Sequence, residues 1–141
     1  MLSTVAVGTD GSATAAKAVE AAAEIAKRFD AKLVLLSASQ NTRQPVSLGG
    51  QGDELQWAHN PDARMREMLH RTEQDLRDQQ IECTTMIDEG DPADVLTRLA
   101  GECDADLLVI GNRGMQRRVL GSVPNSVTHK APCSVYVVKT T

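Results

Sequence analysis

The chain has 141 residues, of which 41% are hydrophobic and 24% charged, a balance typical of one globular domain. Its net charge of −4 argues against binding a polyanion over a broad surface. Aromatic residues make up only 2%, which excludes the base-stacking surfaces of many proteins that bind single-stranded nucleic acids. We therefore expect a single domain, residues 1–141, that binds no nucleic acid.

The first residues and the cysteines indicate where the protein works. Residues 1–11 (MLSTVAVGTDG) contain no basic region and too few apolar residues for a secretory signal. No apolar run approaches the roughly 20 residues of a membrane span. The 3 cysteines have no CxxC spacing, which favours reduced thiols over a disulfide framework. We expect a soluble, cytoplasmic protein that does not contact a membrane.

Strand and helix signals alternate from the start of the chain. Residues 3–8 (STVAVG) form a short β-branched run closed by glycine, which predicts a buried strand. Ser12 is the predicted N-cap of the helix that follows. Residues 31–39 (AKLVLLSAS) give a second apolar strand. The apolar stripe of the predicted helix consists of Ala15, Val19, Ala22, Ile25 and Phe29.

Residues 40–60 interrupt this alternation. They contain several glycines and a proline with little periodicity, which predicts a long, flexible surface loop. Asn60 and Pro61 then provide a cap followed by proline at the first helical position, and the helix is predicted to end near Gln79. Its apolar face consists of Met65, Leu69, Thr72 and Leu76.

Two strands separated by a helix come next. Residues 81–89 (IECTTMIDE) alternate between apolar and polar, which predicts a strand with one wet face at a sheet edge. Asp91 and Pro92 begin the third helix by the same cap-plus-proline logic. Residues 105–111 (ADLLVIG) form a fully apolar strand.

The last predicted elements are a helix and a strand. Ser122 is the predicted N-cap of a fourth helix that ends near Lys130, and residues 133–138 (CSVYVV) form the last strand. Strands and helices therefore alternate along the whole chain. With right-handed crossovers, this order predicts an α/β fold with a parallel, doubly wound sheet and helices on both faces.

In such sheets a ligand binds beyond the carboxyl ends of the strands, where the strand order reverses. Asp10 and the glycines Gly111 and Gly114 follow two strands that we expect to flank this point. The glycines would let a ligand lie against bare backbone, and the amides of Gly121, Ser122 and Val123 would suit a phosphate. Glycine after a strand also simply makes tight turns, which is the alternative interpretation.

Several other kinds of site are disfavoured by missing motifs. GxGxxG, GxxxxGK[ST], HExxH and GxSxG are absent, which argues against a dinucleotide site, a P-loop, a zinc hydrolase and a serine nucleophile. Arg113, Arg117 and Arg118 lie in the glycine segment, either solvated or contacting a phosphate or partner chain. Asp10 is the one evident general base, so we predict no enzyme, or at most slow ATP hydrolysis.

The segments VAVGTDGSATAAKAVEAAAEIAKRFDAKLVLL and DADLLVIGNRG…GSVPNSVTHKAPCSVYVV resemble the universal stress protein family of the UspA type. The resemblance implies five parallel strands in the order 3-2-1-4-5. It also implies that ATP or a related adenine nucleotide binds with Mg²⁺, and that a homodimer forms through the last strand, residues 134–138. Its function would be that of a regulator in the stress response.

The resemblance implies a role for each residue of this sequence that matches part of the family's nucleotide-binding pattern, G-x2-G-x9-G-[ST]. Asp10 would lie near the ribose or a nucleotide-bound Mg²⁺, and Ala38 would contact adenine through its backbone. The glycine segment would contact the ribose and phosphates. The full set of implied nucleotide-binding residues is Gly8, Thr9, Asp10, Ala38, Ile110, Gly111, Gly114, Gly121, Ser122 and Val123.

One departure from the pattern keeps alternatives open. Six residues separate Gly114 from Gly121 where the family has nine, which leaves less chain to wrap a triphosphate. AMP or cyclic AMP is therefore an alternative to ATP, and a homodimeric interaction protein without nucleotide is another. Homodimer formation has an independent argument, because residues 135–138 (VYVV) are apolar on both faces and would form an unprotected sheet edge.

Overall fold

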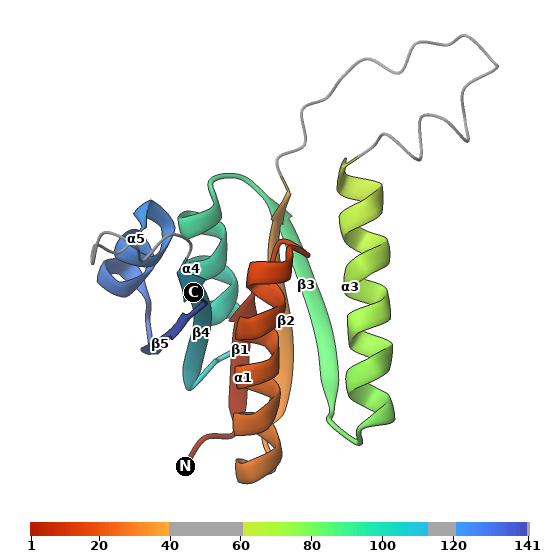
Figure 1. Ribbon diagram of the computed structural model, residues 1–141. Coiled ribbons are helices and arrows are strands. Elements are labelled where there is room, and N and C mark those ends of the chain that lie inside the picture. The colour runs from red at the N-terminus through yellow and green to blue at the C-terminus, as the bar shows by residue number, and fades with distance from the viewer. Residues whose placement is uncertain (40–60, 113–120, 141) are drawn as a thin grey trace, which may run out of the picture.

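The computed structural model describes residues 1–39, 61–112 and 121–140 (Figure 1). The predicted loop 40–60 lies outside the described residues. Within them, strands and helices alternate as the sequence predicts. The strands are β1 (Thr4–Gly8), β2 (Lys32–Ser39), β3 (Cys83–Glu89), β4 (Leu107–Asn112) and β5 (Ser134–Lys139). The helices are α1 (Ala13–Phe29), α3 (Pro61–Asp78), α4 (Pro92–Glu102) and α5 (Ser122–Lys130).

The five strands form one parallel sheet in the order β3-β2-β1-β4-β5, which confirms the predicted topology. β1 lies at the centre, where Ala6 pairs with Val34 of β2 on one side and Leu108 of β4 on the other. β3 and β5 are the edges of the sheet, as expected from their sequences. α1 and α3 cover one face, and α4 and α5 cover the other (Figure 1).

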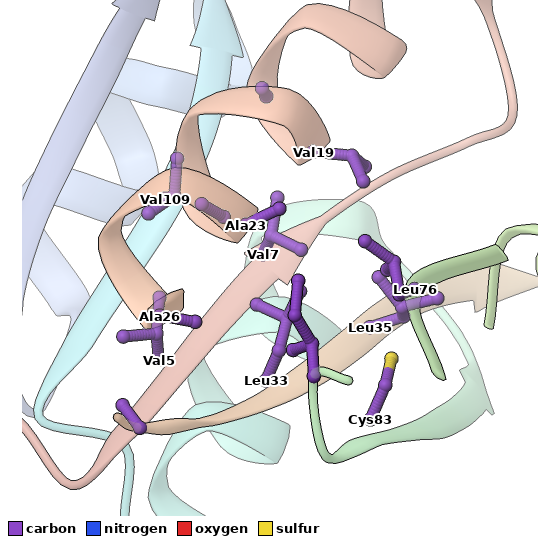
Figure 2. Packing of buried hydrophobic residues seen from close by; sticks show 14 of the residues in the cluster. Val5, Val7, Val19, Ala23, Ala26, Leu33, Leu35, Leu76, Cys83 and Val109 are labelled. Atoms are coloured by element: carbon purple, nitrogen blue, oxygen red, sulfur yellow. The ribbon is translucent and has the colours of Figure 1, made fainter. Parts of the chain in front are cut away.

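The core has two layers, one on each face of the sheet. Under α1 and α3, Val5, Val7 and Leu33 pack together, and Figure 2 shows this cluster reaching Leu76 of α3. Ala6 lies on the opposite face of β1, in the layer under α4 and α5. Each fully buried valine or leucine contributes about 1.5–3 kcal/mol relative to exposure. Burial on both faces explains why the central strands are continuous apolar runs.

The buried face of α1 differs from the predicted stripe. Phe29 is 51% exposed, and Ala15 and Ile25 are only half-buried. The helix instead packs through small side chains, which let its backbone lie close to β1 and β4 and leave the larger residues at its margins. The buried residues of α1 are Ala18, Val19, Ala22, Ala23 and Ala26.

α3 fits its predicted face better. Leu69 and Leu76 are buried, Met65 and Thr72 are half-buried, and the helix ends at Asp78, next to the predicted end. The same pattern of large apolar residues three and four positions apart was the basis of the prediction. The predicted cap of α3, residue 60, lies outside the described part of the chain.

Helix caps were predicted correctly at two helices. The Oγ of Ser12 accepts a hydrogen bond from the Ala15 amide at 3.1 Å, at the start of α1. The Asp91 carboxylate accepts one from the Asp94 amide at 3.2 Å, at the start of α4. Each cap satisfies one of the backbone donors that the first turn of a helix leaves free.

The predicted cap of α5 was wrong. Ser122 is the first residue of the helix, the N-cap is Gly121, and no side chain of its own caps the helix. The Gly121 amide instead donates to Oδ1 of Asn112, at the end of β4, at 3.0 Å. A side chain outside the helix, that of Asn112, thus accepts the hydrogen bond from the N-cap amide. In a capping box, a side chain of the helix itself accepts this bond.

This difference between two serines is testable by chemical denaturation. We expect Ser12→Ala to lower the free energy of unfolding by about 1 kcal/mol, because it removes a side-chain cap. Ser122→Ala should change it by less than about 0.5 kcal/mol, since Ser122 is exposed and caps nothing. Equal losses in the two variants would contradict the assigned start of α5.

Candidate functional site

The carboxyl ends of β1, β2 and β4 and the start of α5 define the candidate site. The turn after β1 is held by its own side chains: the buried Thr9 accepts from the Gly11 amide at 3.1 Å through Oγ1. Oδ1 of Asp10 accepts from the Ser12 amide at 2.9 Å, and the Asp10 side chain remains exposed. Gly11 has a φ of +80°, a conformation that favours glycine. This turn therefore presents a fixed carboxylate to solvent.

Neighbouring strands hold this turn in place. The Thr9 amide donates to the Leu36 carbonyl of β2 at 2.9 Å. A Cβ built on Gly8 would lie 3.4 Å from Cγ2 of Ile110, so the ends of β1 and β4 are in contact. Ala38 is half-buried two residues beyond Leu36, near the end of β2. The structure thus places the predicted residues of these three strands along one edge of the sheet.

β2 also connects this edge to α3. The hydroxyl of Ser39 donates to Oδ2 of Asp62 at 2.7 Å, and the hydroxyl of Ser37 contacts the sulfur of Met65 at 3.0 Å. Both serines are almost fully buried. These contacts fix the end of β2, and with it the backbone at Ala38 that was predicted to contact adenine.

Gly111 is surrounded by the protein's own atoms on its side-chain side. A Cβ at this position would lie 3.2 Å from Cγ2 of Thr140 and 3.7 Å from both Cβ of Ala18 and the carbonyl oxygen of Thr14. The close packing of α1 and the chain after β5 therefore gives this position a reason to be glycine that involves no ligand. Contact between the Gly111 backbone and a nucleotide stays a prediction.

Asn112 is a polar residue of this edge that sequence reasoning did not select. It is fully buried, with 0% of its surface exposed. Its Oδ1 accepts from the Gly121 amide, and its main-chain oxygen accepts from the Thr140 hydroxyl at 2.7 Å. Within the part of the chain that the structure describes, its Nδ2 has no hydrogen-bond partner. The sequence signal was an asparagine between the glycines of the GNRG segment.

The start of α5 lies at the same edge, where Asn112 ends β4 and contacts Gly121. Its first turn contains no acidic residue. The described residues supply no acceptor for the amides of Ser122 and Val123, and Pro124 has no amide to satisfy. Free amides at the positive end of a helix dipole favour a negatively charged group. Gly114, Arg113, Arg117 and Arg118 lie outside the described residues.

A groove of about 450 Å³ lies between α1 and α3. Val19 and Leu76 line it from the two helices, and Thr9 and Gly11 line its end nearest the site. Neither Ala38 nor the residues of β4 and α5 contribute to it. The groove is therefore a separate feature that touches the candidate site only at the β1–α1 turn.

The cysteines offer no activated thiol. Burial raises the pKa of Cys83 to about 12, and burial also raises the pKa of Cys103 and of Cys133. All three are free thiols. Because their pKa values are raised, they remain protonated at neutral pH. Across residues 1–39, 61–112 and 121–140, no group of three or more His, Cys, Asp or Glu could hold a metal. No helix in these ranges could cross a membrane.

Comparisons with known proteins agree with this architecture. The model of the universal stress protein family matches residues 1–139. The chain is 36% identical over 144 residues to universal stress protein Rv1636 of Mycobacterium tuberculosis, covering 98% of this chain and 97% of that protein. The chain therefore belongs to the universal stress protein family.

Solved structures show the same fold. A universal stress protein in complex with cAMP is 31% identical, with a TM-score of 0.75 and 99% of both chains covered. A universal stress protein family protein from Arabidopsis thaliana with AMP bound has a TM-score of 0.79 at 22% identity, covering 99% of this chain and 92% of that one. The second likeness concerns the fold alone.

The packing at Gly111 gives a double-mutant test. We expect Gly111→Val to lower the free energy of unfolding by about 1–3 kcal/mol, because even its Cβ would lie only 3.2 Å from Cγ2 of Thr140. Thr140→Ser removes the clashing methyl but keeps the hydroxyl that donates to Asn112, so it should restore part of the loss. Urea denaturation of the four proteins measures the coupling. Strictly additive effects would contradict the packing role.

Proposed function

We propose that this protein is an adenine-nucleotide-binding regulator of the stress response that works as a homodimer in the cytoplasm. The observation that carries the proposal is the uncapped start of α5, whose free amides of Ser122 and Val123 lie at the sheet edge that also holds Asp10. A phosphate suits the amides, and a ribose hydroxyl suits the exposed carboxylate. Three free cysteines are typical of a reducing compartment.

Cyclic AMP is the nucleotide that we favour. The relative in complex with cAMP is similar to this chain over nearly its whole length. The segment between Gly114 and Gly121 has six residues, three fewer than the family pattern, and a single phosphodiester needs less chain around it than a triphosphate. Two free amides at the start of α5 also match one phosphate better than three.

ATP with Mg²⁺ is the second candidate, and Asp10 is the observation that favours it. Mg²⁺ on a nucleotide commonly uses one or two protein carboxylates together with phosphate oxygens and water. Asp10 is exposed at the candidate site, so its carboxylate fits this role as the partner of a nucleotide-bound ion. The metal would arrive with the nucleotide and would neutralise its phosphates.

We infer that the protein is not an efficient enzyme. Thr9 is bonded within its own turn, the cysteine thiols are protonated, and Asp10 is the one carboxylate of the β1–α1 turn. A solvent-exposed carboxylate is a weak base near neutral pH, so any ATP hydrolysis should be slow. Nucleotide occupancy would act by changing conformation or partner choice.

The proposed dimer forms through β5. This strand pairs only with β4 and leaves its other edge open in the described chain. Tyr136 is 47% exposed, and Val135 and Val137 are half-buried on the opposite face. An apolar edge strand invites pairing, and two copies meeting across a twofold axis would cover it.

A thermal-shift series with cAMP, AMP, ATP and GTP, with and without Mg²⁺, tests the nucleotide. A ligand that binds only the folded state stabilises it by about 2.7 kcal/mol at a hundredfold excess over Kd. For a domain of this size we expect Tm to rise by several degrees with cAMP and less with GTP. A shift with Mg·ATP that exceeds the shift with cAMP would reverse our order of candidates.

The Gly114→Val variant is the control for this series. The family pattern places Gly114 by the ribose and phosphate, so the variant should lose the shift while keeping its circular-dichroism spectrum. If no nucleotide shifts the Tm of the wild-type protein, the proposed function is wrong, and an interaction protein without nucleotide replaces it.

Analytical ultracentrifugation of a β5 variant tests the dimer. Tyr136→Arg places two like charges near the proposed twofold axis, so we expect the dimer dissociation constant to rise at least about tenfold. Tyr136→Phe keeps the apolar ring and should behave as wild type. Because Tyr136 is exposed, neither change should unfold the protein. A wild-type monomer at micromolar concentration would refute the proposed dimer.

A further inference from the structure

We propose that Asn112 positions the start of α5 and makes the site prefer a phosphate-bearing ligand over a neutral one. This inference rests on the proposed function and assigns its phosphate selectivity to one side chain. Asn112 is the last residue of β4, and its carboxamide oxygen accepts a hydrogen bond from the backbone amide of Gly121, the N-cap of α5. It thus connects the edge of the sheet to the helix that supplies the anion-binding amides.

The positioning role follows from how firmly Asn112 is held. Its main-chain oxygen accepts from the hydroxyl of Thr140 at 2.7 Å, and the main-chain oxygen of Thr140 accepts from Nζ of Lys17 at 3.0 Å. β4, the chain after β5 and α1 therefore fix the residue together. Its Oδ1 bond to Gly121 then transmits this fixed position to the start of α5, which has no side-chain cap of its own.

The selectivity role follows from the other half of the carboxamide. Nδ2 of Asn112 is buried and has no partner among the described residues, although nearly all buried polar groups in folded proteins have one. Nδ2 and Oδ1 are bonded to the same carbon, Cγ of Asn112. The donor therefore belongs to the same carboxamide that accepts from the Gly121 amide. The amides of Ser122 and Val123, for which the described residues supply no acceptor, follow directly after Gly121 in the chain.

These donors suit an anion better than any other class of ligand. All of them offer hydrogens, none carries a formal charge, and the first turn of α5 contains no carboxylate to compete for them. Hydrogen bonds to a charged acceptor are stronger than those to a neutral one. We therefore expect the phosphate of a bound nucleotide to gain more from this arrangement than the sugar or base.

The test compares cAMP with adenosine, its neutral counterpart, by calorimetry. Asn112→Asp keeps an oxygen to accept from Gly121 but replaces the free donor with a negative charge. We expect its affinity for cAMP to fall at least tenfold while its affinity for adenosine changes by less than twofold. Asn125→Asp is the matched control, because it adds the same charge at an exposed position in the same helix. It should lose clearly less affinity for cAMP.

The positioning half is tested without ligand, by amide exchange measured by NMR. The Gly121 amide should exchange slowly in the wild type and in Asn112→Asp, and rapidly in Asn112→Ala, which has no acceptor. The amide of Ala6 in β1 reports whether each variant is folded. Rapid exchange at Gly121 in the wild type would overturn the positioning role.

The remaining outcomes are also decisive. Equal losses for cAMP and adenosine in Asn112→Asp would show a purely structural residue and overturn the selectivity role. If the wild type binds neither compound, the proposed function and the selectivity role both fail, while slow exchange at Gly121 still supports the positioning role. If the wild type binds both and Asn112→Asp changes neither affinity, only the selectivity role fails.

Discussion

Helices on both faces of the sheet determine where a ligand can bind this protein. Residues of β1, β2 and β4 pack against α1 and α3 on one side and against α4 and α5 on the other. Polar groups that must meet a ligand are therefore confined to the carboxyl edge, where Thr9 follows β1, Ala38 is the second-last residue of β2 and Asn112 ends β4. The reversal of strand order next to β1 separates the loops there, as in other open α/β sheets.

The starts of the helices differ in a way that bears on function. Ser12 and Asp91 are the side-chain caps of α1 and α4. Each accepts a hydrogen bond from an amide in the first turn of its helix, so that amide needs no ligand as a partner. The N-cap of α5 is Gly121, whose amide donates to Asn112, a residue outside the helix. Residues 1–39, 61–112 and 121–140 supply no acceptor for the next two amides. Side chains thus cap the first turns of α1 and α4, whereas the described chain provides no side-chain cap at α5, where the family pattern places phosphate.

The sequence was sufficient for features that depend on neighbouring residues. The edge position of β3, the apolar face of α3 and the caps at Ser12 and Asp91 all follow from local patterns, whereas the full strand order was implied by the family resemblance. The errors involve contacts between distant segments. The buried face of α1 depends on how closely it approaches β4, and the first amide at the start of α5 is bonded by Asn112 of β4, with no cap from Ser122. The importance of Asn112 became visible only when Gly121 was placed beside it.

Thr140 has a practical consequence for work with this protein. Its side chain is buried, its hydroxyl bonds to β4, and its carbonyl bonds to Lys17, so the chain leaves the fold from a residue that helps to hold the candidate site. We expect a purification tag fused close to Thr140 to disturb those bonds. Met1 is fully exposed and makes a safer attachment point. Affinities measured with tags at opposite ends are therefore not interchangeable.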